Sequence, residues 1–225
     1  MKRKMPDQVF KLTATSKILI RAVMQAIQTP GKLLDLGCGT GIVGISLANA
    51  GKATFPVYFS DVSEDAITYA RNVAFMSCKE CVAKAGSLFE PWHGEKFDTI
   101  VDDVSGVSEP VAKLSPWFQG VACDTDRDGT RLICQVLKET PDHLNPGGRL
   151  FFPVLSLSDE KKILSCAKDH FKQVRILAEQ IWFLPPELHN HLELLQQLSK
   201  EGLIRLEWRF GKWCWYTQIW EASND

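Results

Sequence analysis

The stretch that decides the fold runs over residues 33–44 and reads Leu33-Leu34-Asp35-Leu36-Gly37-Cys38-Gly39-Thr40-Gly41-Ile42-Val43-Gly44. A short apolar run contains an acidic residue near its end, glycines then alternate, and an apolar helical pattern begins. This order predicts a strand that passes into a helix through a turn where a ligand can lie against bare backbone. A tight turn without a ligand is the structural alternative. The glycines fit both G-x-G-x-G and G-x-G-x-x-G, so their spacing alone leaves the ligand class open.

The carboxylate of Asp35 separates the two ligand classes. The G-x-G-x-x-G spacing is the dinucleotide fingerprint, in which a helix N-terminus receives a pyrophosphate. A carboxylate two residues before the first glycine repels phosphates and suits a ligand with a cationic amino end. S-adenosylmethionine, which combines an α-amino acid, a sulfonium and an adenosine, is such a ligand. A nicotinamide-dependent oxidoreductase stays as the alternative that the glycines permit and Asp35 opposes.

Composition indicates a soluble globular protein with one large domain. Of 225 residues, 45% are hydrophobic and 24% are charged, which suffices for a full core. The formal net charge of −1 lacks a basic footprint and argues against a nucleic-acid partner. Seven cysteines, an odd number, indicate a reducing compartment, and we expect a cytoplasmic protein without a membrane span.

Strand and helix patterns alternate along the chain, which is typical of a parallel sheet covered on both faces. Expected strands cover 32–36, 57–60, 82–85, 97–101, 149–155 and 174–183, and expected helices include 41–50 and one capped by Ser63. The stretch 103–129 reads as a long functional loop. Leu188, Leu192, Leu195 and Leu198 predict one amphipathic helix, and strands meeting at a Gly211-Lys212 turn predict a hairpin. Along its first strand, Ile204, Leu206, Trp208 and Phe210 share one face.

A second acidic residue, Asp61, ends the second expected strand. It follows Gly41 by 20 residues, and an acid there can accept both hydroxyls of a ribose. Asp35 and Asp61 then bracket one adenosyl ligand at the carboxyl ends of the strands. The competing interpretation is that Asp61 only caps the helix that follows.

The first motif resembles that of the class I S-adenosylmethionine-dependent methyltransferases, an acidic residue followed by Gly-x-Gly-x-Gly. Over residues 9–155 the chain is similar to the branch that methylates release-factor glutamine and to its small-domain relatives. The similarity is carried by Val9-Phe10, Thr13–Leu19, Gly86–Trp92, Phe97–Val101 and His143–Leu150.

This resemblance implies a Rossmann-like α/β fold, with a mostly parallel seven-stranded sheet and a C-terminal antiparallel hairpin. It also implies a single domain over 1–225, with a helical lead-in at 1–30 and a helical insertion at 186–202. S-adenosyl-L-methionine is the implied cofactor, with Ser87 and Leu88 beside the adenine. The expected cofactor-binding residues are Asp35, Gly37, Cys38, Gly39, Gly41, Asp61, Val62, Ser87, Leu88 and Asp102.

The chain departs from that branch directly after the fourth expected strand. The family carries Asn-Pro-Pro-Tyr there to hold a planar amide, whereas this chain has Asp103-Val104-Ser105-Gly106. An ionised Asp cannot donate a hydrogen bond, so glutamine methylation is in doubt. A carboxylate can instead orient an amine or accept a proton, which makes Asp103 the expected catalytic residue. Asp102 would point to the opposite side of the strand tip.

Two metal-like patterns are interpreted as structural. Asp124-x-Asp126-x-Asp128-Gly129 copies the start of a calcium loop, but Gln135 stands at its twelfth position. Cys78 and Cys81 have the spacing of a zinc pair, yet no second pair follows. We therefore expect no metal. Trp92, Trp117 and Phe118 are expected either to wall the acceptor pocket or to cover the core.

The sequence thus predicts methyl transfer from S-adenosylmethionine to a small molecule or a protein side chain. A catalytically silent methyltransferase-fold partner subunit is the other alternative, since four of the seven tryptophans lie in the C-terminal hairpin and could form an exposed apolar surface.

Overall fold

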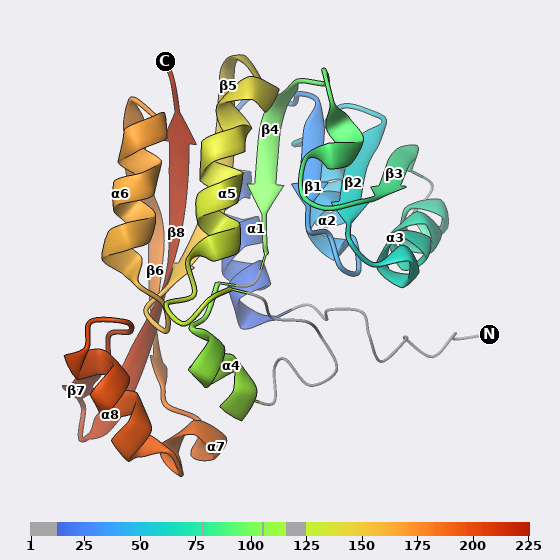
Figure 1. The fold of residues 1–225 in the computed structure, drawn as a ribbon. Helices are drawn as coiled ribbons and strands as arrows, with labels where there is room; N and C mark the ends of the chain where they lie inside the picture. Colours follow the sequence, from blue (N-terminus) through green and yellow to red (C-terminus); the bar gives the residue numbers. More distant parts are fainter. Residues whose placement is uncertain (1–12, 78, 105, 116–124) are drawn as a thin grey trace.

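One sheet forms the central layer of the molecule (Figure 1). The computed structural model describes residues 13–77, 79–104, 106–115 and 125–225. The strands are β1 (Leu33–Leu36), β2 (Val57–Asp61), β3 (Cys81–Ala85), β4 (Phe97–Asp102), β5 (Leu144–Leu155), β6 (Gln173–Phe183), β7 (Glu207–Arg209) and β8 (Lys212–Ser223). The helices are α1 (Ala14–Ala26), α2 (Ile42–Asn49), α3 (Glu64–Met76), α4 (Glu109–Leu114), α5 (Arg131–Glu139), α6 (Glu160–His170), α7 (Pro186–His189) and α8 (Leu192–Lys200), with 3-10 turns η1 (Glu90–Trp92) and η3 (Thr140–His143).

Seven strands follow the order β3-β2-β1-β4-β5-β8-β6, and β7 pairs with β8 beside this path. The first five strands are parallel, whereas β8 runs antiparallel between β5 and β6. The predicted mostly parallel sheet with a C-terminal antiparallel hairpin is confirmed. In such a sheet the carboxyl ends of the parallel strands meet at one edge, which lies at the bottom of Figure 1.

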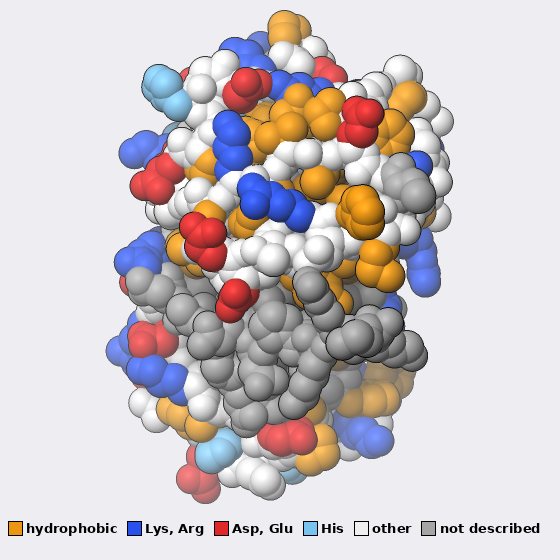
Figure 2. All heavy atoms as spheres, turned by 90° about the vertical axis from the view of Figure 1, so that its right-hand side faces the viewer, with side chains coloured by type: hydrophobic (Ala, Val, Ile, Leu, Met, Phe, Trp, Pro, Cys, Tyr) orange, Lys and Arg blue, Asp and Glu red, His pale blue; other side chains and the backbone are white. Residues whose placement is uncertain are grey.

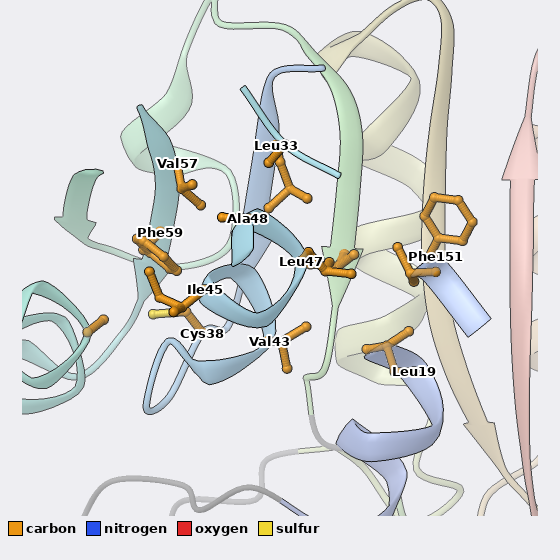
Figure 3. Close-up of a cluster of buried hydrophobic side chains, with 14 of the residues drawn as sticks. Leu19, Leu33, Cys38, Val43, Ile45, Leu47, Ala48, Val57, Phe59 and Phe151 are labelled. Atoms are coloured by element: carbon orange, nitrogen blue, oxygen red, sulfur yellow. The ribbon is translucent and has the colours of Figure 1, made fainter. Parts of the chain in front are cut away.

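Helices cover both faces of this sheet (Figure 1). On one face α2 and α3 pack against β1, β2 and β3, and α1 packs against β5, β6 and β8. Leu19, Val43 and Phe59 belong to the buried cluster on this face (Figure 3). On the other face α5 packs through Ile133, Val136 and Leu137, which share one side of the helix because they are three or four residues apart. Ile163 of α6 extends that second cluster.

A third buried cluster lies below the carboxyl edge, where α4, α7 and α8 gather in Figure 1. Val111 of α4, Leu188 of α7 and Leu195 of α8 join Trp215 of β8 in it. The predicted single helix over Leu188–Leu198 is therefore wrong, because α7 and α8 are separate. The predicted structureless stretch 103–129 also contains α4.

The C-terminal hairpin differs from its predicted register by one residue. Arg209 pairs with Lys212, so the turn residues are Phe210 and Gly211, which have φ of 55° and 69° as a type I′ turn requires. The expected buried face is also interrupted: Ile204 and Leu206 are buried, but Trp208 and Phe210 are 60% and 77% exposed. Within the part of the chain that the structure describes, the hairpin tip is therefore exposed to solvent.

Two smaller differences concern the middle of the chain. β5 begins at Leu144, before the expected strand start at residue 149, and its pairing with β4 shifts register between Phe97 and Thr99. The predicted cap is confirmed, since the Ser63 hydroxyl accepts a hydrogen bond from the Ala66 N–H. Among the described helices, none combines the length and apolarity needed to span a membrane.

The central strand gives a direct test of this packing. Leu34 of β1 is fully buried in the second cluster, so Leu34→Ala should lower the free energy of unfolding by about 2–5 kcal/mol through lost burial and a cavity. Urea denaturation measures the change. Leu194→Ala on the surface of α8, where the side chain is 40% exposed, is the control and should cost less than about 1 kcal/mol. Equal losses in both variants would contradict this description of the core.

Candidate functional site

The glycine turn between β1 and α2 is left-handed at three positions. Gly37, Gly39 and Gly41 have φ of 65°, 49° and 71°, a conformation that side chains with a Cβ disfavour. At two of them a Cβ would also collide: Val104 lies 2.6 Å from a Cβ built on Gly37, and Ala70 lies 2.8 Å from one on Gly41. The glycines are therefore required both by the backbone path and by close packing.

Two carboxylates hold this turn in place. Asp35 Oδ2 accepts a hydrogen bond from the Gly44 N–H at 2.7 Å, and Asp61 Oδ2 accepts one from the Gly39 N–H at 2.9 Å. Asp61 Oδ1 accepts from the Ser63 N–H at 2.9 Å, so Asp61 also supports the start of α3, as the capping interpretation expected. Its predicted role at a ribose stays a prediction.

The sheet brings two further carboxylates to the same edge. Leu36 of β1 pairs with both Ser60 of β2 and Asp102 of β4, which aligns the three strand ends. Asp102 is fully buried and its Oδ1 accepts from the Val104 N–H at 3.0 Å. Asp103 follows directly and accepts a hydrogen bond from the Ser16 hydroxyl at 2.5 Å.

These acidic groups are close enough to affect one another. Burial raises the pKa of Asp35 well above its ordinary range, and the charges of Asp103, Asp61 and Asp102 raise it further. Burial and Asp103 raise the pKa of Asp102 to about 8, and burial raises that of Asp103 to about 6 against the Ser16 hydrogen bond. Within the part of the chain that the structure describes, Asp35 Oδ1 and Asp102 Oδ2 are buried without a hydrogen-bond partner. The described part of this edge is therefore a cluster of acidic groups that repel one another.

The other predicted cofactor residues surround the turn. Cys38 is buried, its N–H donates to the Ser60 carbonyl at 2.9 Å, and burial raises the pKa of its thiol, which disfavours the thiolate form. Val62 is 78% exposed beside Asp61. Ser87 is exposed and its N–H donates to Glu90 Oε2 at 3.1 Å, while Leu88 packs on the second cluster with φ of 45°.

An apolar pocket of about 270 Å³ lies beside Asp103. It is lined by the start of α1, by the segment after β4, and by the ends of β5, β6 and β8 that lie at the same edge of the sheet. The rings of Trp182 and Trp215 on its wall are stacked, with centroids 6.0 Å apart and planes 29° apart. The Trp182 indole N–H donates to Thr217 Oγ1 at 3.0 Å.

Sequence reasoning missed the residue that holds Asp103. Ser16 lies in a capping box at the start of α1: its N–H donates to Thr13 Oγ1, and the Thr13 N–H donates to Ser16 Oγ. Ser16 is 2% exposed, and its hydroxyl donates a hydrogen bond to Asp103. The Thr-x-x-Ser spacing could have revealed the cap. Only the fold shows that the cap faces the end of β4.

Several predicted residues do not form this pocket. Trp92 is 1% exposed in the second core cluster, so the pocket-wall interpretation is wrong for it, while Trp117 and Phe118 lie outside the described residues. Asp124 and Cys78 also lie outside them. Asp128 accepts hydrogen bonds from the N–H and hydroxyl of Thr130 and from Lys162, which is the expected structural role before α5.

Comparisons with known proteins agree with the fold described above. Residues 9–103 match the family model of the methyltransferase small domain. The chain has the class I methyltransferase fold. The predicted resemblance is therefore confirmed, and the methyltransferase interpretation is favoured over the oxidoreductase.

Two curated relatives and one solved structure illustrate the similarity. The chain is 29% identical to release factor glutamine methyltransferase of Thermosynechococcus vestitus, covering 77% of this chain and 64% of that protein. It is 26% identical to ribosomal RNA small subunit methyltransferase C of Alcanivorax borkumensis, covering 77% and 46%. A 16S rRNA methyltransferase of T. thermophilus in complex with AdoMet and guanosine matches with a TM-score of 0.60 and 14% identity, over 96% of this chain and 44% of that one. The chain thus spans less than two thirds of these relatives.

The residues at the strand tips fit the predicted cofactor. Asp35 Oδ1 and Asp102 Oδ2 are buried acceptors that have no hydrogen-bond partner among the described residues, and a sulfonium and an ammonium would supply positive charge to them. The glycine turn leaves backbone free of side chains beside them. The family match and the fold support S-adenosylmethionine as cofactor.

The buried carboxylates predict an unusual pH dependence of stability. Because folding raises the pKa of Asp102 to about 8, the folded state binds more protons than the unfolded state between about pH 4 and pH 8, and the free energy of unfolding falls as pH rises through that window. Asp102→Asn should reduce this fall by ~2–5 kcal/mol, measured by urea denaturation at several pH values. Asp169→Asn on the exposed surface of α6 should leave it unchanged. Identical pH slopes for Asp102→Asn and wild type would contradict the assignment.

Filling the glycine turn should remove cofactor binding. Gly37→Val places a branched side chain at φ of 65° and against Val104, and we expect at least ~10-fold weaker binding of S-adenosylhomocysteine by calorimetry. Gly51→Val is the matched control, because Gly51 has φ of 69° but no atom within 4 Å of a built Cβ. It should carry a similar backbone strain and bind normally. A folded Gly37→Val variant with unchanged affinity would show that the turn is only structural.

Proposed function

We propose that this chain transfers a methyl group from S-adenosylmethionine to an acceptor bound beside Asp103. The observation that carries the proposal is the set of four carboxylates, Asp35, Asp61, Asp102 and Asp103, around a left-handed glycine turn. Such a cluster favours a ligand with a sulfonium and an ammonium and repels a pyrophosphate. A nicotinamide cofactor carries a negatively charged pyrophosphate, which these carboxylates would repel.

The cofactor would be held by residues of the strand tips. The backbone of Gly37–Gly41 would contact the amino-acid end of the cofactor. Asp61 would accept hydrogen bonds from the ribose hydroxyls in exchange for part of those that it now accepts from the backbone. Ser87 and Leu88 would flank the adenine. A solved relative of the same fold binds AdoMet, as its complex records, which supports this assignment.

The bound cofactor supplies an electrophilic methyl group with a good leaving group. The chain's own contribution is position and proton transfer: the pocket holds the acceptor, and Asp103 accepts the proton that the acceptor loses. With a pKa of about 6, Asp103 is mostly ionised above that pH and is better matched to a proton acceptor than an ordinary carboxylate. Ser16 holds one of its oxygens and thereby orients the other.

The acceptor is proposed to be a small molecule or a protein side chain. The net charge of −1 and the replacement of Asn-Pro-Pro-Tyr by residues 103–106 argue against an RNA base and a glutamine amide. Figure 2 shows acidic and basic side chains interspersed over the described part of the face that it presents, rather than a continuous basic surface. Relatives named for rRNA make RNA the acceptor class to be tested against this proposal.

A catalytically silent partner subunit is the second candidate function. The exposed side chains of Trp208 and Phe210 at the hairpin tip favour it, because such side chains together can form a docking surface. Asp103 has a raised pKa and lies beside an apolar pocket, which favours an enzyme instead.

Calorimetry with S-adenosylmethionine, S-adenosylhomocysteine and NAD⁺ tests the cofactor. We expect both adenosyl ligands to bind and NAD⁺ not to bind. Because only S-adenosylmethionine carries the sulfonium charge, its affinity relative to S-adenosylhomocysteine should rise between pH 6 and pH 8 as the carboxylates ionise. Binding of NAD⁺ alone would overturn the proposal.

The role of Asp103 is tested by turnover with a labelled methyl donor. Asp103→Asn should leave the affinity for S-adenosylhomocysteine within about threefold and lower turnover by ~10²–10⁴-fold. Ser16→Ala should lower turnover less and shift the acidic limb of the pH–rate profile upward, because Asp103 loses a hydrogen bond that lowers its pKa. Full turnover in Asp103→Asn would remove this residue from the mechanism.

A further inference from the structure

We propose that the methyl acceptor is a small uncharged aromatic molecule whose hydroxyl or amino group faces Asp103, and that the walls formed by Trp182 and Trp215 bind its ring. This inference rests on the proposed function and names its substrate class. It is carried by the composition of the pocket, by the position of Asp103 in it, and by the contacts that fix its tryptophan wall.

The pocket wall is built from flat apolar surfaces. Trp182 and Phe183 come from the end of β6, Trp215 from β8, and Pro153 and Pro185 lie beside them. The indoles of Trp182 and Trp215 line the pocket and are stacked on each other, and an aromatic ring that packs against such side chains binds more tightly than its buried area alone predicts. An aliphatic group of the same size lacks that additional attraction.

The tryptophan wall is fixed before any ligand arrives. The Trp182 indole N–H donates to Thr217 Oγ1 at 3.0 Å, and Thr217 is fully buried on β8. Trp215 is 7% exposed and belongs to the third core cluster. A preformed wall binds a rigid planar ligand with little loss of side-chain entropy.

The polar groups on the described lining of the pocket favour an uncharged acceptor. Among the described residues that line it, Asp103 is the one ionisable side chain, and Thr13 and Thr15 add hydroxyls. A phosphate or carboxylate on the acceptor would find no lysine or arginine on this lining and would face the acidic edge. A nucleotide within RNA is therefore disfavoured, and so is an acidic metabolite.

The reacting atom of the acceptor is the hydroxyl oxygen or amino nitrogen that faces Asp103. The lone pair of this atom forms the new bond to the methyl carbon as the carbon–sulfur bond breaks and the sulfonium becomes a thioether. The proton of the hydroxyl or amine passes to the carboxylate of Asp103, so the products are the methylated ring compound, S-adenosylhomocysteine and a neutral Asp103. This balance needs no further reactant.

Binding to the chain loaded with S-adenosylhomocysteine tests the acceptor class. The probe is 2-naphthol, and its saturated counterpart decahydro-2-naphthol has the same skeleton and hydroxyl without the aromatic ring. Calorimetry should show 2-naphthol binding roughly 2- to 10-fold more tightly. A panel of phenols and arylamines with labelled S-adenosylmethionine should then contain methylated products.

Variants locate the binding site. Gly106 lines the pocket, and a Cβ built on it meets no atom within 4 Å, so Gly106→Leu should obstruct the pocket without straining the fold and weaken 2-naphthol binding at least ~10-fold. Gly106→Ala is the matched control and should change it by less than about threefold. Trp182→Ala should weaken binding about 10-fold and Trp182→Phe much less, whereas Trp208→Ala, at the exposed hairpin tip, should have no effect.

The outcomes separate the two proposals. Failure of S-adenosylhomocysteine to bind would overturn the proposed function itself. Normal cofactor binding with no preference for 2-naphthol over its saturated counterpart, or with equal affinity in Gly106→Leu, would overturn the aromatic acceptor alone. Methyl transfer to a release-factor peptide or a 16S rRNA hairpin, with none to the phenols and arylamines, would do the same.

Discussion

Two carboxylates on neighbouring strands support the turn around which the site is built. Asp35 accepts from the Gly44 N–H at 2.7 Å and Asp61 accepts from the Gly39 N–H at 2.9 Å, so the start of α2 and the middle of the turn are both tied to the sheet. A turn with three left-handed residues has a high conformational entropy when unfolded, and these bonds help to hold it in one conformation. The bare backbone that results is the surface on which an adenosyl ligand can lie.

The same edge concentrates negative charge where burial makes it costly. Asp35 and Asp102 each keep one buried oxygen that accepts no hydrogen bond from residues 13–77, 79–104, 106–115 or 125–225, and burial raises the pKa of both. Groups of this kind are destabilising in a folded protein unless a ligand or a proton compensates them. The proposed cationic cofactor would relieve that cost on binding.

The acceptor side is assembled from parts of the chain that are far apart. The capping box at Thr13 and Ser16 orients Asp103, and β8, inserted antiparallel between β5 and β6, brings Trp215 beside Trp182. The helices α7 and α8 and the third cluster support this wall from below. The parallel strands thus provide the edge proposed for the cofactor, and β6 and β8 provide much of the pocket wall.

Local chemistry along the chain determined the strand-turn-helix of residues 33–44, the alternation of strands and helices, the cap at Ser63 and the acids at the strand ends. Each depends on neighbouring residues and on periodicity, so each could be predicted. The roles of those acids toward a cofactor stay predictions. Tertiary structure alone decided that Ser16 reaches Asp103, that Trp92 is core while Trp182 and Trp215 wall a pocket, and that Trp208 and Phe210 are exposed. These features depend on which helices and strands pack against each other in the fold. The alternation of apolar and polar residues along a strand is the same whether or not another element covers the apolar side.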